Sequence, residues 1–193
     1  MKAAANTILR EHLATTGNLS EQELEQVLVR FQQRQCRKGE ALFREGERVK
    51  HIFFVAKGLL KLVYHDDVAK EHILSFAMEQ WWETDFQAFY EQTPTALSLH
   101  CLENCLLFQL PLEDYLLLCK ELPTFERFLF QKSIAGHIAS QKRILSLLTN
   151  QAKERYELLV KQFPQLVQRL PKGQLAAYLG VTRETLSRLY SST

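Results

Sequence analysis

Short apolar runs punctuated by glycine restrict what the first half of this chain can fold into. In CRKGEALFREGERVKHIFFVAKGLLKLVYHDDVAKEHILSF, residues 36–76, Gly39, Gly46 and Gly58 separate apolar runs of three to six residues. Runs of this length suit strands, and glycines between them suit tight turns. We interpret HIFFVAKGLLKLVY as a hairpin that turns at Lys57-Gly58, and strands resume at ALSLHCLENCLLFQL. The pattern predicts an antiparallel β-roll or jelly roll.

Helical patterns flank these strands, so the expected fold class is α+β. Ser20 and Glu23 have capping-box spacing at the start of an N-terminal helix. The stretch TDFQAFYEQ predicts a short helix between strands, and Pro111 and Pro123 each begin another helix. Beyond Asn150 follows an amphipathic helix, AKERYELLVKQF.

The helix that begins at Pro123 predicts an interface with a second copy of the chain. Five of its side chains are spaced four, three, four and three residues apart: Ile134, Ile138, Gln141, Leu145 and Leu148. This spacing forms an a/d seam of about two heptads, which is enough for a helix to pair with its own copy. Packing of the helix on its own β-roll is the alternative, and it explains Phe125, Phe128 and Leu129 better.

Near the C-terminus, QLAAYLGVTRETLSRLY predicts a helix, a tight turn and a second helix. Gly180 stands where the turn needs a residue with positive φ. Thr182 is a suitable N-cap for the second helix, and Leu186 and Leu189 point that helix back at the first. The outer face of the second helix then carries four polar side chains: Arg183, Glu184, Ser187 and Arg188.

This outer face has the chemistry needed to read a DNA major groove. Arginine donates a bidentate pair to guanine O6 and N7, and glutamate accepts from cytosine N4. Lys172, at the start of the first helix, is expected beside the phosphate backbone. Residues 150–193 hold seven Lys/Arg against three Glu, whereas residues 1–149 hold 17 Lys/Arg against 19 Asp/Glu. A basic C-terminal piece therefore favours nucleic acid over a merely solvated helical face.

The chain lacks the residue patterns that enzymes and metal-binding proteins need. The histidines are scattered singly, and the sequence has no HExxH, GxSxG, GxxxxGK[ST] or GxGxxG motif. We therefore expect no enzyme, no metal and no cofactor, and a metal-dependent jelly-roll enzyme remains only a third hypothesis. The four cysteines, Cys36, Cys101, Cys105 and Cys119, are interpreted as small buried side chains in a reducing compartment.

The same patterns predict a cytoplasmic protein without a membrane segment. The longest apolar runs, such as YLLLC at residues 115–119, are far too short to span a bilayer. The first residues, MKAAANTILREHL, carry charges throughout and have no apolar core of a secretory signal.

These motifs together resemble the CRP/FNR family of bacterial transcription regulators over roughly residues 20–190. The resemblance implies a cyclic-nucleotide-binding-like β-roll with N-terminal helices in residues 1–122, a dimerisation helix in 123–149 and a helix-turn-helix DNA-binding domain in 150–193. The family usually continues into the β-strands of a wing. We expect a helix-turn-helix that lacks the C-terminal part of this wing.

The resemblance also assigns roles to individual residues. It places Arg183, Glu184 and Arg188 on base-reading positions. Ser187 falls on the position that distinguishes the FNR branch from the CRP branch. Thr185 and Lys172 fall on phosphate-contacting positions, and with the N-cap the expected DNA-binding set is Lys172, Thr182, Arg183, Glu184, Thr185, Ser187 and Arg188.

Departures from the family pattern concern the small-molecule site. The cyclic-nucleotide branch carries Gly-Glu and later Arg-Ser/Thr-Ala, and the corresponding residues here are Trp82-Glu83 and Thr95-Ala96. No Lys or Arg lies between Glu71 and Cys119, where eight carboxylates occur. A cyclic phosphate needs a cation or several backbone donors, so we expect cyclic AMP not to be the effector.

An unidentified small-molecule effector would then occupy an apolar pocket, unless side chains fill it. The residues expected around it are Phe76, Trp81, Trp82, Glu83, Phe86, Thr95, Ala96, and Ser140 and Gln141 of the long helix. An oxygen-sensing iron–sulfur cluster is not expected, because the N-terminal cysteine cluster of the family's redox branch is missing.

The leading hypothesis is a homodimeric, sequence-specific DNA-binding transcription regulator. Its expected partners are double-stranded DNA, a second copy of the chain and RNA polymerase. The alternative is a ligand-sensing β-roll whose C-terminal helices bind a protein partner. Salt separates the two, because DNA binding weakens steeply with added salt and an apolar helical interface does not.

Overall fold

The chain folds into two compact units that combine antiparallel sheets with helices. The computed structural model describes the backbone of residues 2–190 and the side chains of residues 7–188. The first unit comprises Met1–Tyr64 and Ser75–Lys132, and the second comprises His65–Leu74 and Ser133–Thr193. Within residues 2–190, no helix combines the length and the apolarity that a bilayer crossing requires.

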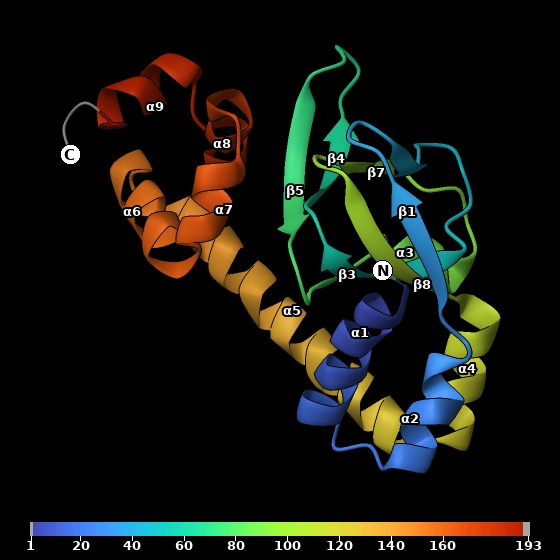
Figure 1. Cartoon of the computed structure of the whole chain (residues 1–193). Coiled ribbons are helices and arrows are strands. Elements are labelled where there is room, and N and C mark those ends of the chain that lie inside the picture. Colours follow the sequence, from blue (N-terminus) through green and yellow to red (C-terminus); the bar gives the residue numbers. More distant parts are fainter. Residues whose placement is uncertain (1, 191–193) are drawn as a thin grey trace. The chain divides into compact units, whose positions relative to one another are not determined.

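The elements follow the order that the sequence patterns predict (Figure 1). The strands are β1 (Gln32–Cys36), β2 (Ala41–Phe43), β3 (His51–Lys57), β4 (Leu60–His65), β5 (Glu71–Ala77), β6 (Trp82–Glu83), β7 (Leu97–Cys101) and β8 (Cys105–Pro111). The helices are α1 (Lys2–Gly17), α2 (Glu21–Leu28), α3 (Phe86–Glu91), α4 (Leu112–Glu121), α5 (Pro123–Thr149), α6 (Ala152–Gln162), α7 (Pro164–Arg169), α8 (Lys172–Leu179) and α9 (Arg183–Tyr190).

Two four-stranded sheets form the β-roll, with strand orders β1-β8-β3-β6 and β2-β7-β4-β5. The predicted antiparallel roll is confirmed, but the predicted hairpin at Lys57-Gly58 is wrong, because β3 and β4 lie in different sheets. The turn carries the chain from one sheet to the other. Gly58 has a φ of 111°, and a Cβ atom there would lie 2.5 Å from the Sγ of Cys105. Only glycine fits this crossing without displacing its neighbours.

Local signals at the N-terminal helices are confirmed. The Ser20 Oγ accepts a hydrogen bond from the Glu23 backbone N at 3.3 Å, and the Ser20 backbone N donates to the Glu23 carboxylate at 2.7 Å. This is the predicted capping box at the start of α2. Leu24 and Val27 of α2 are buried in the same core as Leu9 and Leu13 of α1.

The indole of Trp82 is the centre of an aromatic cluster that joins α1, β3 and the start of α5. Its ring centroid lies 5.1 Å from that of Phe54 and 6.0 Å from that of Phe128. The indole Nε1 donates to the Nε2 of His12, which is buried, at 3.3 Å. Burial and the nearby charge of Lys132 lower the pKa of His12 to about 4. His12 is therefore neutral at neutral pH, as an acceptor for the indole must be.

Glu83, the neighbour of Trp82, is a buried carboxyl group with two hydrogen-bond donors. The Ser75 Oγ donates to it at 2.6 Å, and the Thr84 backbone N donates at 3.1 Å. Burial nevertheless dominates, with a smaller effect of the nearby Asp85 charge, and raises the pKa of Glu83 to about 7. Successive strand residues point to opposite faces, which explains why Trp82 and Glu83 meet different neighbours.

His12 and Glu83 make opposite contributions to stability as the pH falls from 7 to 5. In this range His12 takes up a proton in the unfolded chain but not in the folded chain, and this lowers the free energy of unfolding. Glu83 takes up a proton in the folded chain but not in the unfolded chain, and this raises the free energy of unfolding. Each effect is about 2 kcal/mol over this range, so they nearly cancel. We expect the free energy of unfolding of His12→Gln to rise on acidification and that of Glu83→Gln to fall.

Urea unfolding at pH 7, 6 and 5 measures both slopes. The wild-type protein is the control, since other groups titrate equally in all three proteins. If the free energy of unfolding changed with pH in the same way in both variants, the opposite pKa shifts of His12 and Glu83 would be contradicted.

Candidate nucleic-acid interface and β-roll interior

The turn between α8 and α9 has the backbone geometry that the sequence predicts. Gly180 ends α8 in the left-handed region, with φ 66° and ψ 36°. Its backbone N donates to the Ala177 carbonyl at 3.2 Å, and the Val181 backbone N donates to the Ala176 carbonyl at 3.0 Å. These bonds satisfy carbonyls that would otherwise lack partners at the helix end. The chain can therefore reverse direction tightly at this point.

The start of α9 is capped as expected. The Oγ1 of Thr182 accepts from the Thr185 backbone N at 3.2 Å, and the Thr182 carbonyl accepts from the Leu186 backbone N at 3.0 Å. Leu186 is fully buried, as is Leu175 of α8. The predicted inward position of Leu189 lies outside the described side chains. The two helices thus form a packed pair with a capped second helix.

Two arginines hold the C-terminal end of α8, and the sequence patterns do not reveal them. The Nη1 of Arg143, on α5, donates to the Tyr178 carbonyl at 3.0 Å, and its guanidinium stacks 3.6 Å from the centroid of the Tyr178 ring. Its Nη2 donates to the Ile73 carbonyl at 3.0 Å. The Nε of Arg155, on α6, donates to the Leu179 carbonyl at 2.9 Å. Positive charge at a helix C-terminus offsets the helix dipole, so both arginines stabilise α8.

The polar residues predicted for DNA contact lie at the first residue of α8, at the N-cap of α9 and along α9. Thr185 is half-buried, and the others are exposed: Lys172, Thr182, Arg183, Glu184, Ser187 and Arg188. Hydrogen bonds from the backbone and from Thr182, together with the charges of Arg183 and Arg188, lower the pKa of Glu184. The α9 surface therefore presents an ionised carboxylate between two cations.

The interior of the β-roll contains polar groups on β5, on β6 and around α3. Besides Glu83 with Ser75, the Thr95 Oγ1 donates to the Asp85 carboxylate at 2.5 Å. Asp85 also caps α3 by accepting from the Ala88 backbone N at 3.2 Å. Asp85 and Ser75 were not among the residues predicted for this region. The capping position of Asp85 before FQAFYE was the available signal, and Ser75 had none beyond its strand.

The residues predicted to line a pocket do not share one environment. Phe76, Glu83 and Thr95 are buried, whereas Phe86 and Ala96 are exposed. Trp82 packs in the aromatic cluster with His12, Phe31, Phe54 and Phe128. Trp81 is half-buried against the same core. Ser140 and Gln141 are exposed on α5, in the second unit.

A buried cation, Lys61, precedes the stretch between Glu71 and Cys119 that lacks Lys and Arg. Lys61 of β4 has 8% of its surface exposed and stands opposite His100 of β7. Leu60 and Leu62, its neighbours, belong to the hydrophobic core. Because side chains alternate along a strand, Lys61 lies on the opposite face of the sheet.

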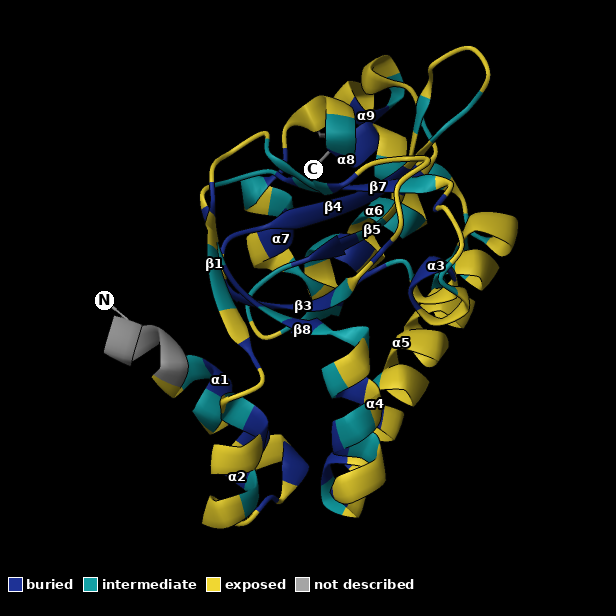
Figure 2. Ribbon diagram, turned by 90° about the vertical axis from the view of Figure 1, so that its right-hand side faces the viewer, coloured by how far each residue is buried: buried dark blue, intermediate teal, exposed yellow. Residues whose placement is uncertain are grey.

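The long helix α5 changes character along its length. Phe125, Phe128 and Leu129 are buried within the first unit, as the alternative reading of this helix predicts. The later turns are largely exposed, as the yellow ribbon in Figure 2 shows. The predicted seam lies entirely in this part: Ile134, Ile138, Gln141, Leu145 and Leu148 are all exposed.

Comparison with known proteins identifies the β-roll. Residues 33–121 match the cyclic nucleotide-binding domain family. No curated protein sequence matches the chain.

Solved structures share the fold over most of the chain. The catabolite activator protein of Thermus thermophilus is 24% identical, with 90% of this chain and 83% of that chain covered and a TM-score of 0.57. The c-di-GMP-responsive global regulator CLP of Xanthomonas campestris is 17% identical, with 90% and 91% covered and a TM-score of 0.69. FixK2 of Bradyrhizobium japonicum is 14% identical, with 84% and 83% covered and a TM-score of 0.72.

Proposed function

We infer that the chain is a CRP/FNR-type regulator, because residues 33–121 match the cyclic nucleotide-binding domain family and the chain has the fold of CRP/FNR regulators, which its sequence resembles. On this premise we propose that it is a transcription regulator of that type, which binds DNA as a homodimer through α9. Residues 1–122 serve as the sensing part, residues 123–149 as the dimerisation helix and residues 150–193 as the DNA-binding part. RNA polymerase is a further partner in this proposal.

One observation carries the proposal: α9 is a capped helix with two cations and a carboxylate on its exposed face. Leu175 and Leu186 are fully buried between the helices, and Arg143 and Arg155 hold the end of α8. A helix supported in this way can place its side chains reproducibly against base edges. Arg183 and Arg188 match guanine, and Glu184 matches cytosine N4.

Replacement of Arg188 by alanine tests the role of α9. We expect Arg188→Ala to weaken binding to the selected DNA site by about 1–3 kcal/mol and to relax the base preference at one position. Lys172→Ala should weaken binding to all sequences alike, because a phosphate contact carries no base information. Site selection with purified protein, followed by fluorescence anisotropy, measures both effects.

Lys153→Ala is the matched control for these variants. Lys153 is an exposed cation on α6 that pairs with Glu157 at 3.9 Å and is not among the residues predicted to contact DNA. We expect this variant to bind DNA like the wild type. Unchanged site selection by Arg188→Ala, or binding that is insensitive to added salt, would contradict the proposal and favour a protein partner.

The exposed seam on α5 supports the homodimer. Its apolar members, Ile134, Ile138, Leu145 and Leu148, have 43%, 43%, 59% and 78% of their surfaces exposed. Their spacing matches that of a helix pair, in which such side chains interdigitate. A pair of α9 helices held by this seam would read two half-sites of a palindrome.

A charge within the seam should dissociate the dimer. Burial of an unpaired carboxylate is unfavourable, so we expect Leu145→Glu to raise the dimer dissociation constant by about tenfold or more. Val68→Glu is the control, since Val68 is 82% exposed on the turn between β4 and β5, outside α5. Analytical ultracentrifugation measures both. A monomeric wild type, or a dimeric Leu145→Glu, would rule out this seam.

The carboxylates around Thr95 support a response to something other than cyclic AMP. Asp85 already accepts from the Thr95 hydroxyl, and the buried Glu83 lies two residues before Asp85 in the sequence. A cyclic phosphate here would meet negative charge, and it would lack the charge-assisted pair of an arginine, which is worth roughly 1.5–3 kcal/mol. We propose an effector without a phosphate or an unliganded mode of regulation.

Calorimetric titration with cyclic AMP tests this point. We expect no binding in the micromolar range by the wild type. Asp85→Asn should bind cyclic AMP more strongly than the wild type, because asparagine caps α3 equally well and removes one negative charge. Micromolar binding by the wild type would overturn this part of the proposal.

A further inference from the structure

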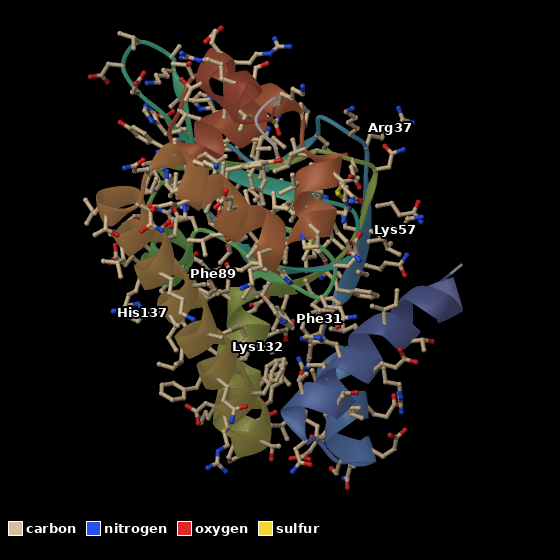
Figure 3. All side chains as sticks on the ribbon, turned by 90° about the vertical axis from the view of Figure 1, so that its left-hand side faces the viewer. Phe31, Arg37, Lys57, Phe89, Lys132 and His137 are labelled. Carbon is tan, nitrogen blue, oxygen red and sulfur yellow. The ribbon has the colours of Figure 1, made fainter. Side chains whose placement is uncertain are left out.

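Arg143 joins the long helix α5 to the helix pair α8 and α9 by contacts that all lie within the second unit. Lys132 and His137, labelled in Figure 3, flank the point on α5 where the first unit ends and the second begins. The Nη1 of Arg143 donates to the Tyr178 carbonyl near the end of α8, and its Nη2 donates to the Ile73 carbonyl of β5, each at 3.0 Å. One side chain of α5 therefore holds the helix pair and a strand at the same time.

The chemistry of this junction is specific to arginine. A guanidinium is planar and presents its N–H groups in a fixed fork, so it can donate to two carbonyls from different elements and keep its face against a ring. The Arg143 guanidinium lies 3.6 Å from the centroid of the Tyr178 ring. Partial burial lowers the pKa of Arg143 against an opposing effect of Tyr178, and the group stays charged at neutral pH. A lysine would keep the charge but could not make both bonds and the stack together.

A second side chain of α5 supports the same junction. Leu147 follows Arg143 by four residues and therefore lies on the same face of the helix. A Cβ atom at Gly180, in the turn between α8 and α9, would lie 3.6 Å from the Cδ2 of Leu147. The backbone of the turn thus packs against Leu147. The bond to the Tyr178 carbonyl and this contact hold α8 and the turn on one face of α5.

This face lies opposite the predicted dimer seam. Successive residues of an α-helix are about 100° apart around its axis. Leu145 is therefore about 200° from Arg143, and Leu148 is about 140° from it. Both seam residues are exposed, whereas Arg143 is half-buried. In the proposed dimer, each pair of helices α8 and α9 would lie on the outer side of its own α5. The orientation of the pair on α5 would then decide how far apart the two α9 helices stand.

We propose that Arg143 is a positioning residue that sets the spacing of the two half-sites that the dimer accepts. In the proposed function, on which this rests, two α9 helices read a palindrome whose half-site centres are about 34 Å apart. One inserted base pair moves a half-site by about 3.4 Å along the duplex and turns it by about 35° around the axis. A comparable movement of α8 and α9 on α5 would favour another spacing. Arg143 opposes this movement, because its bonds to Tyr178 and Ile73 run to two different elements.

Duplexes with altered half-site spacing test the role of Arg143. The half-site that the wild type selects is placed in inverted pairs whose centres differ by zero, one or two base pairs from the selected spacing. Fluorescence anisotropy measures the dissociation constant of the full chain for each duplex. We expect the wild type to bind the selected spacing about tenfold or more tightly than its neighbours, and Arg143→Lys to reduce this preference to about threefold or less. The base preference within a half-site should stay unchanged, because the side chains of α9 are retained.

Two further variants separate positioning from charge and from folding. Tyr178→Leu removes the ring against the guanidinium but keeps the charge and the backbone carbonyl, and it should reduce the spacing preference in the same direction. Lys153→Ala, which removes an exposed cation of α6, is the matched control and should keep the wild-type preference. Circular dichroism and analytical ultracentrifugation should show that the variants are folded and dimeric like the wild type. Tyr178→Leu decides the question if Arg143→Lys does not fold.

The same spacing preference in the wild type and in Arg143→Lys would overturn this inference and leave the proposed function intact. So would a wild-type dimer that binds all spacings alike, or a folded Arg143→Lys that loses base preference and spacing preference together. A wild type that selects no DNA sequence would instead contradict the proposed function, and this inference with it.

Discussion

The contact between Trp82 and His12 connects the parts of the first unit that are far apart in sequence. Trp82 stands on the two-residue strand β6, and its indole reaches α1 through His12 and the start of α5 through Phe128. Burial and the charge of Lys132 keep His12 neutral, and its Nε2 can therefore accept the indole proton. The N-terminal helix, the sheet edge and the first turns of the long helix are placed by this one cluster.

Sequence periodicity predicts the elements of this fold better than it predicts their partners. The spacing of Gly39, Gly46 and Gly58 revealed short strands and turns, and Ser20 with Glu23 revealed a helix start. The same signals failed at Lys57-Gly58, where a hairpin was expected and the chain instead crosses between sheets. A turn motif predicts that the backbone bends at this point. It does not predict the sheet to which the next strand belongs, because that depends on long-range strand pairing, such as that of β3 with β8.

The pair of helices α8 and α9 shows the same difference between local and long-range signals. Gly180 and Thr182 were predictable because a positive φ and an N-cap depend on the local chain. Arg143 and Arg155 were not, since their bonds to Tyr178 and Leu179 join residues that are 35 and 24 positions apart. Trp82 of β6 was expected to line a pocket, but it lies in an aromatic cluster. Successive side chains of a strand point to opposite faces, so Trp82 and Glu83 have different neighbours.

The net charge differs in sign between the first 149 residues and the C-terminal residues of the chain. The carboxylates between Glu71 and Cys119 and the balance of −2 over residues 1–149 disfavour contact of the β-roll with a polyanion. The balance of +4 over residues 150–193 favours it for the C-terminal residues. In the proposed complex with DNA, electrostatics would therefore orient the protein before any base is read. The side chains of α9 would then need to supply only the preference among sequences.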